Sequence, residues 1–211
     1  MTSLFPHLEG VIPDSRFGTL AEQAAAAEAW ETPRWAARAI LEAELLTRCV
    51  VDPCCGTGIL SEAAVSAGYH VMPIDLYYWG YGAPGFDWFG DQAAESVGAF
   101  VADRPFTVFM NPPFSRATEF VDRAFDLGAR KIVCFQRQAW RESRDRRQWW
   151  EAHPPARTWV CGDRAVPYLL HLSAEERKAM NGMQTAHAWY VWERHHKGAE
   201  IGGAIWKDMG R

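Results

Sequence analysis

The run from Cys49 to Asp75 constrains the fold of this chain more than any other part of it. Its first four residues, 49–52, form a short apolar run that predicts a buried strand, and a tight PCCGTG turn follows at 53–58. Residues 59–67 predict a helix, and 70–75 predict a second strand that ends in Asp75, as the first ends in Asp52. A strand, glycine turn, helix and second strand in this order are typical of the beginning of a doubly wound α/β sheet.

The alternation of helices and strands continues on both sides of this run. Thr32 is a good N-cap and Pro33 a good first residue for a helix that reaches 46. An Arg-rich segment, 136–150, has a helix-like pattern that Pro154 and Pro155 end. Further helices are expected at 92–101 and 117–127, and further strands at 106–110, 131–135, 157–161, 187–192 and 203–207. We therefore predict one α/β, Rossmann-like, mostly parallel sheet.

Length and composition favour a single domain. With 211 residues, 48% of them apolar, the chain is long enough for one core, with 1–31 as an N-terminal lead-in and 32–211 as the domain. Five cysteines without a CxxC pair indicate neither disulfides nor a zinc site, so we expect no metal and a cytoplasmic location. No apolar run approaches the roughly 20 residues that span a bilayer. A net charge of −4 gives no overall sign of nucleic-acid binding, so local patches must provide it.

The glycine turn predicts a binding site for a polar ligand. Glycines between a strand and a helix let backbone N–H groups approach such a ligand closely. The dinucleotide-binding pattern GxGxxG is absent, because Ile-Leu-Ser follows Gly58. Asp52, at the end of the first strand, is placed to meet an ammonium group, and Asp75 to accept the hydroxyls of a ribose. Together they suit an aminoacyl-nucleoside such as S-adenosylmethionine, with a purely structural turn and a solvated Asp75 as the alternative.

The segment Asn111-Pro112-Pro113-Phe114 follows the predicted strand at 106–110. The amino group of an aromatic ring is a poor nucleophile because its lone pair is delocalised into the ring. An amide oxygen from Asn111 and the carbonyl of Pro112 can accept the hydrogens of such an amino group and favour a tetrahedral nitrogen. Paired prolines fix the loop, and Phe114 offers a flat face for stacking. Asn111 to Phe114 are therefore the candidate catalytic residues, although the same four residues also suit an ordinary strand-to-helix turn.

The two motifs together resemble the amino-methyltransferases of the class I S-adenosylmethionine-dependent superfamily, specifically small phage and prophage DNA adenine-N6 methyltransferases. This resemblance covers residues 30 to 207 and implies a sheet with an antiparallel late strand. Thr32-Pro33 resembles the segment against the methionine end of the cofactor, and Asp87 the acid at its adenine, with Asp91 as the rival. The resemblance and the turn together imply these cofactor-binding residues: Thr32, Pro33, Asp52, Pro53, Cys54, Gly56, Gly58, Asp75, Leu76, Asp87, Trp88 and Asn111.

The resemblance also implies DNA as the substrate. We expect no separate target-recognition domain, unlike in the sequence-specific restriction enzymes, and therefore short or relaxed specificity. A base inside a duplex is out of reach, so the target base is flipped out or lies in a single strand. The Arg-rich helix is the candidate contact for the phosphates, and Glu142 and Asp145 leave a self-paired, solvated helix as the alternative. The arginines in question are Arg137, Arg141, Arg144 and Arg147.

Several alternatives remain open at this stage. The same chemistry suits cytosine N4, a guanine in RNA or a glutamine side chain in a protein, and the fold also suits a non-catalytic cofactor- or DNA-binding module. The aromatic loop 77–81 either stacks on a nucleic-acid base or roofs the cofactor. His195 and His196 are adjacent, which suits a surface turn better than a metal site. Cys54 and Cys55 are expected to line the cofactor turn without thiol chemistry.

Overall fold

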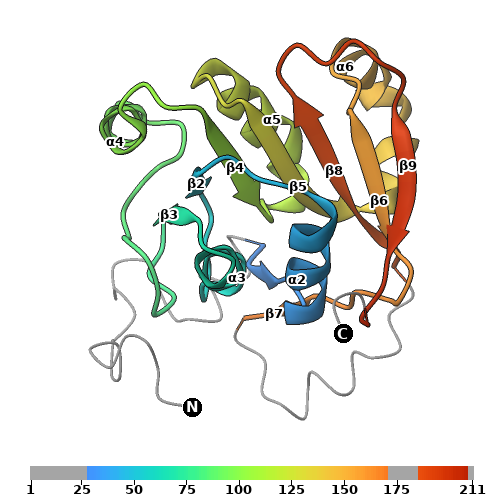
Figure 1. Cartoon of the computed structure of the whole chain (residues 1–211), viewed down its shortest axis with the longest axis horizontal. Coiled ribbons are helices and arrows are strands. Elements are labelled where there is room, and N and C mark those ends of the chain that lie inside the picture. Colours follow the sequence, from blue (N-terminus) through green and yellow to red (C-terminus); the bar gives the residue numbers. More distant parts are fainter. Residues whose placement is uncertain (1–27, 171–184, 209–211) are drawn as a thin grey trace.

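A computed structural model describes residues 28–170 and 185–208 of the chain. Its main sheet has seven strands in the order β3-β2-β4-β5-β8-β6-β9 (Figure 1). All strand pairs in it are parallel except the two that involve β8, which confirms the predicted mostly parallel sheet with an antiparallel late strand. The strands are β2 (Cys49–Asp52), β3 (His70–Pro73), β4 (Phe106–Met110), β5 (Lys131–Arg137), β6 (Arg157–Cys161), β8 (His187–Glu193) and β9 (Ile201–Ile205).

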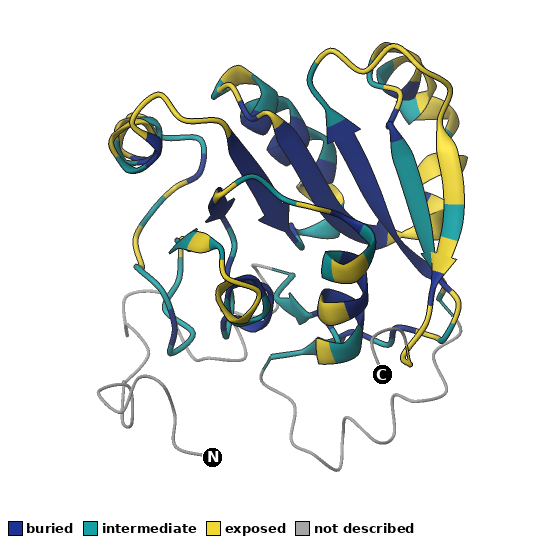
Figure 2. Cartoon of the chain, viewed as in Figure 1, coloured by how far each residue is buried: buried dark blue, intermediate teal, exposed yellow. Residues whose placement is uncertain are grey.

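Helices cover both faces of this sheet, as in a doubly wound fold. One apolar cluster joins one face to α2 (Arg34–Ala43) and α3 (Ile59–Ser66). A second cluster joins the other face to α4 (Asp91–Val101), α5 (Ala117–Asp126) and α6 (Arg147–Ala152). The central strands β4, β5 and β8 are almost entirely buried, whereas the edge strand β9 is largely exposed (Figure 2). The core therefore lies in two layers around the middle of the sheet.

A separate two-stranded ribbon lies beyond the carboxyl ends of β2 and β4 (Figure 1). It pairs β1 (Trp30–Glu31) with β7 (Tyr168–Leu169) in antiparallel fashion. Most of the expected lead-in, residues 1–27, lies outside the described residues. Its last part is the strand β1 of this ribbon, which brings it to the edge of the sheet where the sequence motifs lie.

The predicted Arg-rich helix over 136–150 is wrong. The strand β5 continues to Arg137, which pairs with His187 of β8, so the backbone of 136 and 137 belongs to the sheet. Two 3-10 turns follow, η4 (Gln138–Glu142) and η5 (Arg144–Arg146), separated by Ser143 in an extended conformation, before α6 begins. Sheet pairing and the packing of aromatic rings override the local helical pattern here. The rings are those of Trp140, Trp149, Trp150, Tyr190 and Trp192.

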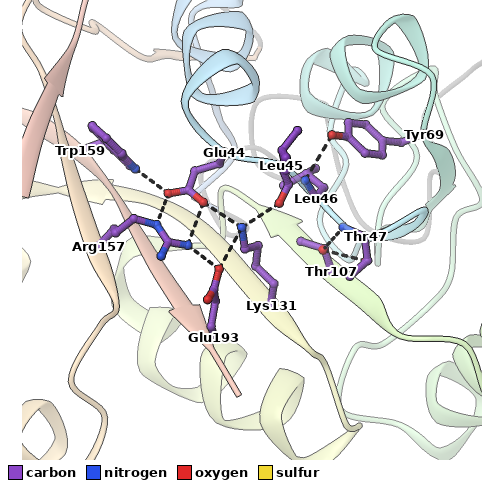
Figure 3. A network of polar contacts seen from close by, with 10 residues as sticks. All are labelled: Glu44, Leu45, Leu46, Thr47, Tyr69, Thr107, Lys131, Arg157, Trp159 and Glu193. Atoms are coloured by element: carbon purple, nitrogen blue, oxygen red, sulfur yellow. Dashed lines mark hydrogen bonds and ion pairs between the residues drawn. The ribbon is translucent and has the colours of Figure 1, made fainter. Parts of the chain in front are cut away.

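A network of charged side chains lies at the amino end of β5, the end where the strand begins at Lys131 (Figure 3). Glu44, just after α2, accepts hydrogen bonds from Lys131 at 2.8 Å, from Arg157 and from the indole N–H of Trp159 at 2.7 Å. Glu193 pairs with the same two cations, so two acids face two bases. Every charge in the network has a partner, which fits a purely structural tie between α2 and the strands β5, β6 and β8.

None of the helices in the described part of the chain is both long and apolar enough to cross a membrane. His195 and His196 are exposed, and His195 lies in a turn directly after β8, as expected for a surface turn. Residues 28–170 and 185–208 contain no group of three His, Cys, Asp or Glu side chains that could hold a metal ion.

Candidate active site

A cavity of about 200 Å³ lies at the carboxyl edge of the sheet. Its walls come from five segments that are distant in sequence: 28–32, 53–60, 75–79, 86–89 and 111–116. Of the residues expected to bind a cofactor, the cavity is lined by Thr32, Pro53, Cys54, Gly56, Asp75, Leu76, Asp87, Trp88 and Asn111. The fold therefore brings both sequence motifs to one concave site, where ligands of open α/β sheets bind.

The glycine turn forms the floor of this cavity. Gly56 and Gly58 both have positive φ, of 54° and 93°, a backbone conformation that other residues adopt rarely. A Cβ atom on Gly58 would come within 2.5 Å of the ring of Tyr81, so the turn is packed closely from behind. Gly58 therefore shapes the turn without lining the cavity. Pro33, the N-cap residue of α2, does not line the cavity either.

Asp52 lies behind the turn and does not line the cavity. Its side chain is buried, and its Oδ2 accepts a hydrogen bond of 2.7 Å from the hydroxyl of Ser61 in the first turn of α3. Burial raises the pKa of Asp52 to about 7. The structure thus places this carboxylate where it holds the glycine turn on α3, away from the position expected for a contact with a ligand's ammonium group.

Asp75 reaches the cavity wall from the end of β3. Its Oδ2 accepts the backbone N–H of Gly56 at 3.0 Å, and its Oδ1 accepts the backbone N–H of Tyr77 at 2.9 Å and the indole N–H of Trp79 at 3.2 Å. Burial raises the pKa of Asp75 to about 6. A carboxylate has about four acceptor positions, so Asp75 can accept one further hydroxyl from a ligand.

Two glutamates of the cavity were not expected from the sequence. Glu31 of β1 accepts a hydrogen bond from the hydroxyl of Thr57, and Glu28 accepts the backbone N–H of Ser115 at 3.2 Å. Glu31 directly precedes the Thr32-Pro33 pair, which is the only local signal that points to it. The carboxylates that line the cavity are those of Glu28, Glu31, Asp75 and Asp87, against the single cation Arg116, which is paired with Glu119. This cavity favours a ligand that carries positive charge.

Asn111 leaves β4 with its side-chain amide oriented by the ribbon. Its Nδ2 donates a hydrogen bond of 2.6 Å to the carbonyl of Trp30. The opposite orientation would set two oxygens against each other, so this bond fixes which atom of the amide is the oxygen. Its Oδ1 is buried and has no hydrogen-bond partner within the described residues. A buried acceptor without a partner is costly, and a bound donor would remove that cost.

Phe114 faces a second, smaller cavity of about 20 Å³. Its ring lies 6.2 Å from that of Trp30 at an interplanar angle of 17°, and the guanidinium of Arg137 lies 4.5 Å from the ring centre. His187 completes this wall, and burial lowers its pKa to about 4, so its imidazole is neutral near pH 7. Trp30 lines both cavities, and Asn111 and Pro113 line the larger one. The NPPF segment therefore lies between an acidic cavity and an aromatic one.

The four arginines expected to contact DNA are not gathered on one face. Arg141 forms a bidentate pair with Glu200, with distances of 2.6 and 2.8 Å, and Arg147 pairs with Glu151 at 2.7 Å. Arg144 is exposed on η5, and only Arg137 lies at the second cavity. The self-paired alternative therefore describes Arg147, whose partner lies in the same helix, whereas the partner of Arg141 lies outside the segment.

The structure also places the remaining candidates of this region. Tyr77 and Trp79 line the larger cavity, so part of the aromatic loop forms one of its walls. Asp87 lines it as well, with its Oδ1 accepting the N–H of Phe89 at 3.0 Å, whereas the rival Asp91 begins α4 outside it. Burial raises the pKa values of the Cys54 and Cys55 thiols, which keeps both protonated. Neither thiol is an activated nucleophile.

No protein-family model and no curated protein matches the sequence. Among solved structures, the chain is similar to a putative RNA methyltransferase from Pyrococcus horikoshii (12% identity, 83% of this chain and 99% of that one, TM-score 0.43). It is also similar to a predicted O-methyltransferase from Agrobacterium tumefaciens (12% identity, 80% and 85%, TM-score 0.46). A third is a plantazolicin methyltransferase in complex with SAH (10% identity, 76% and 83%, TM-score 0.43). Because these TM-scores are below 0.5, we base no conclusion about function on them.

Proposed function

We propose that this chain is an S-adenosylmethionine-dependent methyltransferase that acts on the exocyclic amino group of a flat heteroaromatic ring, with N6 of adenine in DNA as the first candidate. The observation that supports this most is the amide of Asn111. Its nitrogen donates a hydrogen bond to the carbonyl of Trp30, and its buried oxygen has no hydrogen-bond partner among the described residues. That arrangement suits an N–H donor delivered by a substrate.

The larger cavity suits S-adenosylmethionine by shape and charge. The glycine turn leaves the backbone open to a ligand, and Asp75, Asp87 and Trp88 line the cavity, where we propose that Asp75 accepts a ribose hydroxyl and the other two contact the adenine. Glu28 and Glu31 take over the role that the sequence suggested for Asp52, because they face the cavity and attract the ammonium and sulfonium groups. When bound, this cofactor supplies an electrophilic methyl group.

We infer that two residues position the acceptor: Asn111, which lines the larger cavity, and Pro112, which is buried beside it. Asn111 Oδ1 and the carbonyl of Pro112 each accept one N–H of the amino group, which directs the nitrogen lone pair toward the methyl carbon. With the methyl group supplied by a bound cofactor, the amino nitrogen would gain that methyl group and give one of its two protons to water, while Asn111 and Pro112 would hold it in place. No basic side chain is required for this transfer.

The aromatic cavity favours a heteroaromatic acceptor over a glutamine side chain. Phe114, Trp30 and the neutral imidazole of His187 present flat faces, and a base gains stacking energy from such faces that an aliphatic amide does not. The guanidinium of Arg137 lies over the ring of Phe114, and we propose that it contacts the phosphate of a flipped or single-stranded nucleotide. The choice of adenine in DNA depends on the family resemblance of the NPPF motif.

A transfer experiment with separate acceptors tests this proposal. Wild-type protein is incubated with S-adenosylmethionine labelled in its methyl group and with single-stranded DNA, duplex DNA, RNA or protein, followed by nucleoside and amino-acid analysis. We expect labelled N6-methyladenine from DNA. Label in N4-methylcytosine, in RNA or in glutamine would move the assignment to that acceptor. Cofactor binding without transfer to any pool would indicate a non-catalytic module and overturn the proposal.

A further inference from the structure

Gln136 is a buried polar side chain that directly follows the apolar run 132–135 of β5. It lies in β5 directly after Phe135 and is only 1% exposed. A buried amide is costly unless it is hydrogen-bonded, so its presence requires a partner. The side-chain Nε2 donates a hydrogen bond of 3.2 Å to the carbonyl oxygen of Pro112. The partner is thus one of the two acceptors proposed to hold the substrate's amino group.

The register of the sheet explains this contact. The parallel pairing of β4 with β5 ends at Met110 opposite Cys134, and two residues further along Pro112 comes beside Gln136. On its other side, Gln136 is already paired with Ala188 of β8. A proline has no backbone N–H with which to continue the ladder of strand hydrogen bonds. The side chain of Gln136 therefore continues the attachment between β4 and β5 into the NPPF loop.

We propose that Gln136 is a positioning residue for methyl transfer: its side-chain amide fixes the carbonyl of Pro112 so that this carbonyl and Asn111 Oδ1 accept the two hydrogens of the acceptor amino group. This inference rests on the proposed function. A carbonyl oxygen has two lone pairs, so the bond from Gln136 occupies one and leaves the other for the substrate. Loss of that bond therefore removes a side-chain contact that sets the direction of the carbonyl.

The first test compares Gln136→Leu with a matched control. The leucine keeps the side chain close to its original size and removes the donor, so we expect kcat to fall about 10- to 100-fold while the cofactor Kd stays within about twofold. The control is Thr107→Val, which removes a buried side-chain hydrogen bond from the other end of β4, where Thr107 Oγ1 accepts the N–H of Thr47 at 3.0 Å. That variant should lose comparable thermal stability and keep its kcat.

Gln136→Glu gives a readout that a merely structural role would not produce. A protonated carboxyl group can donate to the carbonyl of Pro112, whereas an ionised one cannot. Burial would raise the pKa of this new carboxyl group. We therefore expect the activity of Gln136→Glu, relative to wild type, to recover several-fold as the pH falls from about 8 to about 6. Gln136→Leu should show no such recovery.

Carbonyl NMR tests the hydrogen bond without any activity. The sequence contains two Pro-Pro pairs, 112–113 and 154–155. Protein labelled with proline that carries both a 13C carbonyl and 15N therefore gives only two carbonyl signals coupled to nitrogen. We expect the Pro112 signal to shift between wild type and Gln136→Leu, with the Pro154 signal unchanged as an internal control.

These measurements separate the possible failures. An unchanged Pro112 signal, or a loss of kcat no greater than that of Thr107→Val, overturns the role of Gln136 while the proposed function stands. A shifted Pro112 signal in a wild-type protein that methylates no amino acceptor contradicts the proposed function itself, and the positioning role then falls with it.

Discussion

The two ends of the central strands both hold buried polar groups, but they treat them differently. At the amino end of β5, Glu44, Lys131, Arg157 and Glu193 satisfy one another, and the indole of Trp159 completes the set (Figure 3). At the carboxyl end of β4, by contrast, Asn111 lines a cavity, and its buried Oδ1 has no hydrogen-bond partner among the described residues. A saturated network holds a structure together, whereas an open acceptor at a cavity wall is available to a ligand.

Substitution of Asn111 provides the largest expected effect on this contrast. Asn111→Ala removes the amide oxygen that accepts the substrate's N–H, so we expect kcat to fall by about 1000-fold, or about 4 kcal/mol of transition-state stabilisation. The cofactor Kd, measured by calorimetry, should change only a few-fold, because most of that cavity is formed by other residues. Single-turnover transfer with labelled cofactor gives the rate. A variant that turns over at the wild-type rate would remove Asn111 from the mechanism.

Substitution at the saturated end should affect stability and leave chemistry intact. Glu44→Ala leaves the buried Lys131 and the half-buried Arg157 with Glu193 as their remaining carboxylate in the network, which should lower the free energy of unfolding by about 3 kcal/mol. Urea unfolding measures this loss, and kcat should stay near the wild-type value at a temperature where the variant is folded.

Burial alone would raise the pKa of Glu44, but its hydrogen bonds with Arg157, Lys131 and Trp159 hold that pKa below its ordinary value. The network's contribution is therefore expected above the unfolded pKa of about 4.5 and is lost as the pH falls further. Equal acid sensitivity in wild type and Glu44→Ala would contradict this account.

The smallest expected effect concerns the pH dependence of cofactor binding. Burial raises the pKa of Asp75 to about 6 in the free protein, and hydroxyl donors of a ligand bind its ionised form better. Protonation therefore opposes binding, so the cofactor Kd should rise by up to about tenfold for each unit that the pH falls below about 6. Calorimetry at several pH values measures this slope. Asp75→Asn should bind more weakly with a flatter profile, and an unchanged slope in that variant would assign the effect to another group, such as Asp52.

Local sequence patterns predicted the parts of this fold that depend on local physics. Apolar runs such as 49–52 and 106–110 are buried strands because their residues fit no other environment, and the glycine turn and NPPF follow them directly. The helix over 136–150 could not be predicted correctly, because its fate depends on β8, about fifty residues later in the chain.

The candidate site shows the same division. The motif residues Asn111 and Asp75 lie at the cavity, as their places at strand ends suggested. Asp52 also ends a strand, but its carboxylate accepts a hydrogen bond from the hydroxyl of Ser61 and does not line the cavity. Trp30 and Glu31 reach the site through the pairing of β1 with β7, which joins Trp30 to Leu169 and Glu31 to Tyr168, residues 139 and 137 positions apart. No pattern near residue 30 encodes that pairing.

The ribbon of β1 and β7 contributes to the candidate site without being part of the main sheet. Its two strands pair with each other and belong to a different sheet from the seven-stranded one. Yet Trp30 supplies walls to both cavities and orients Asn111 through its carbonyl. A fragment that begins at α2 would retain every strand of the main sheet but lose β1, the strand that orients the amide of Asn111. When this protein is shortened for crystallisation or design, a well-folded core is therefore a poor guide to which residues the candidate site requires.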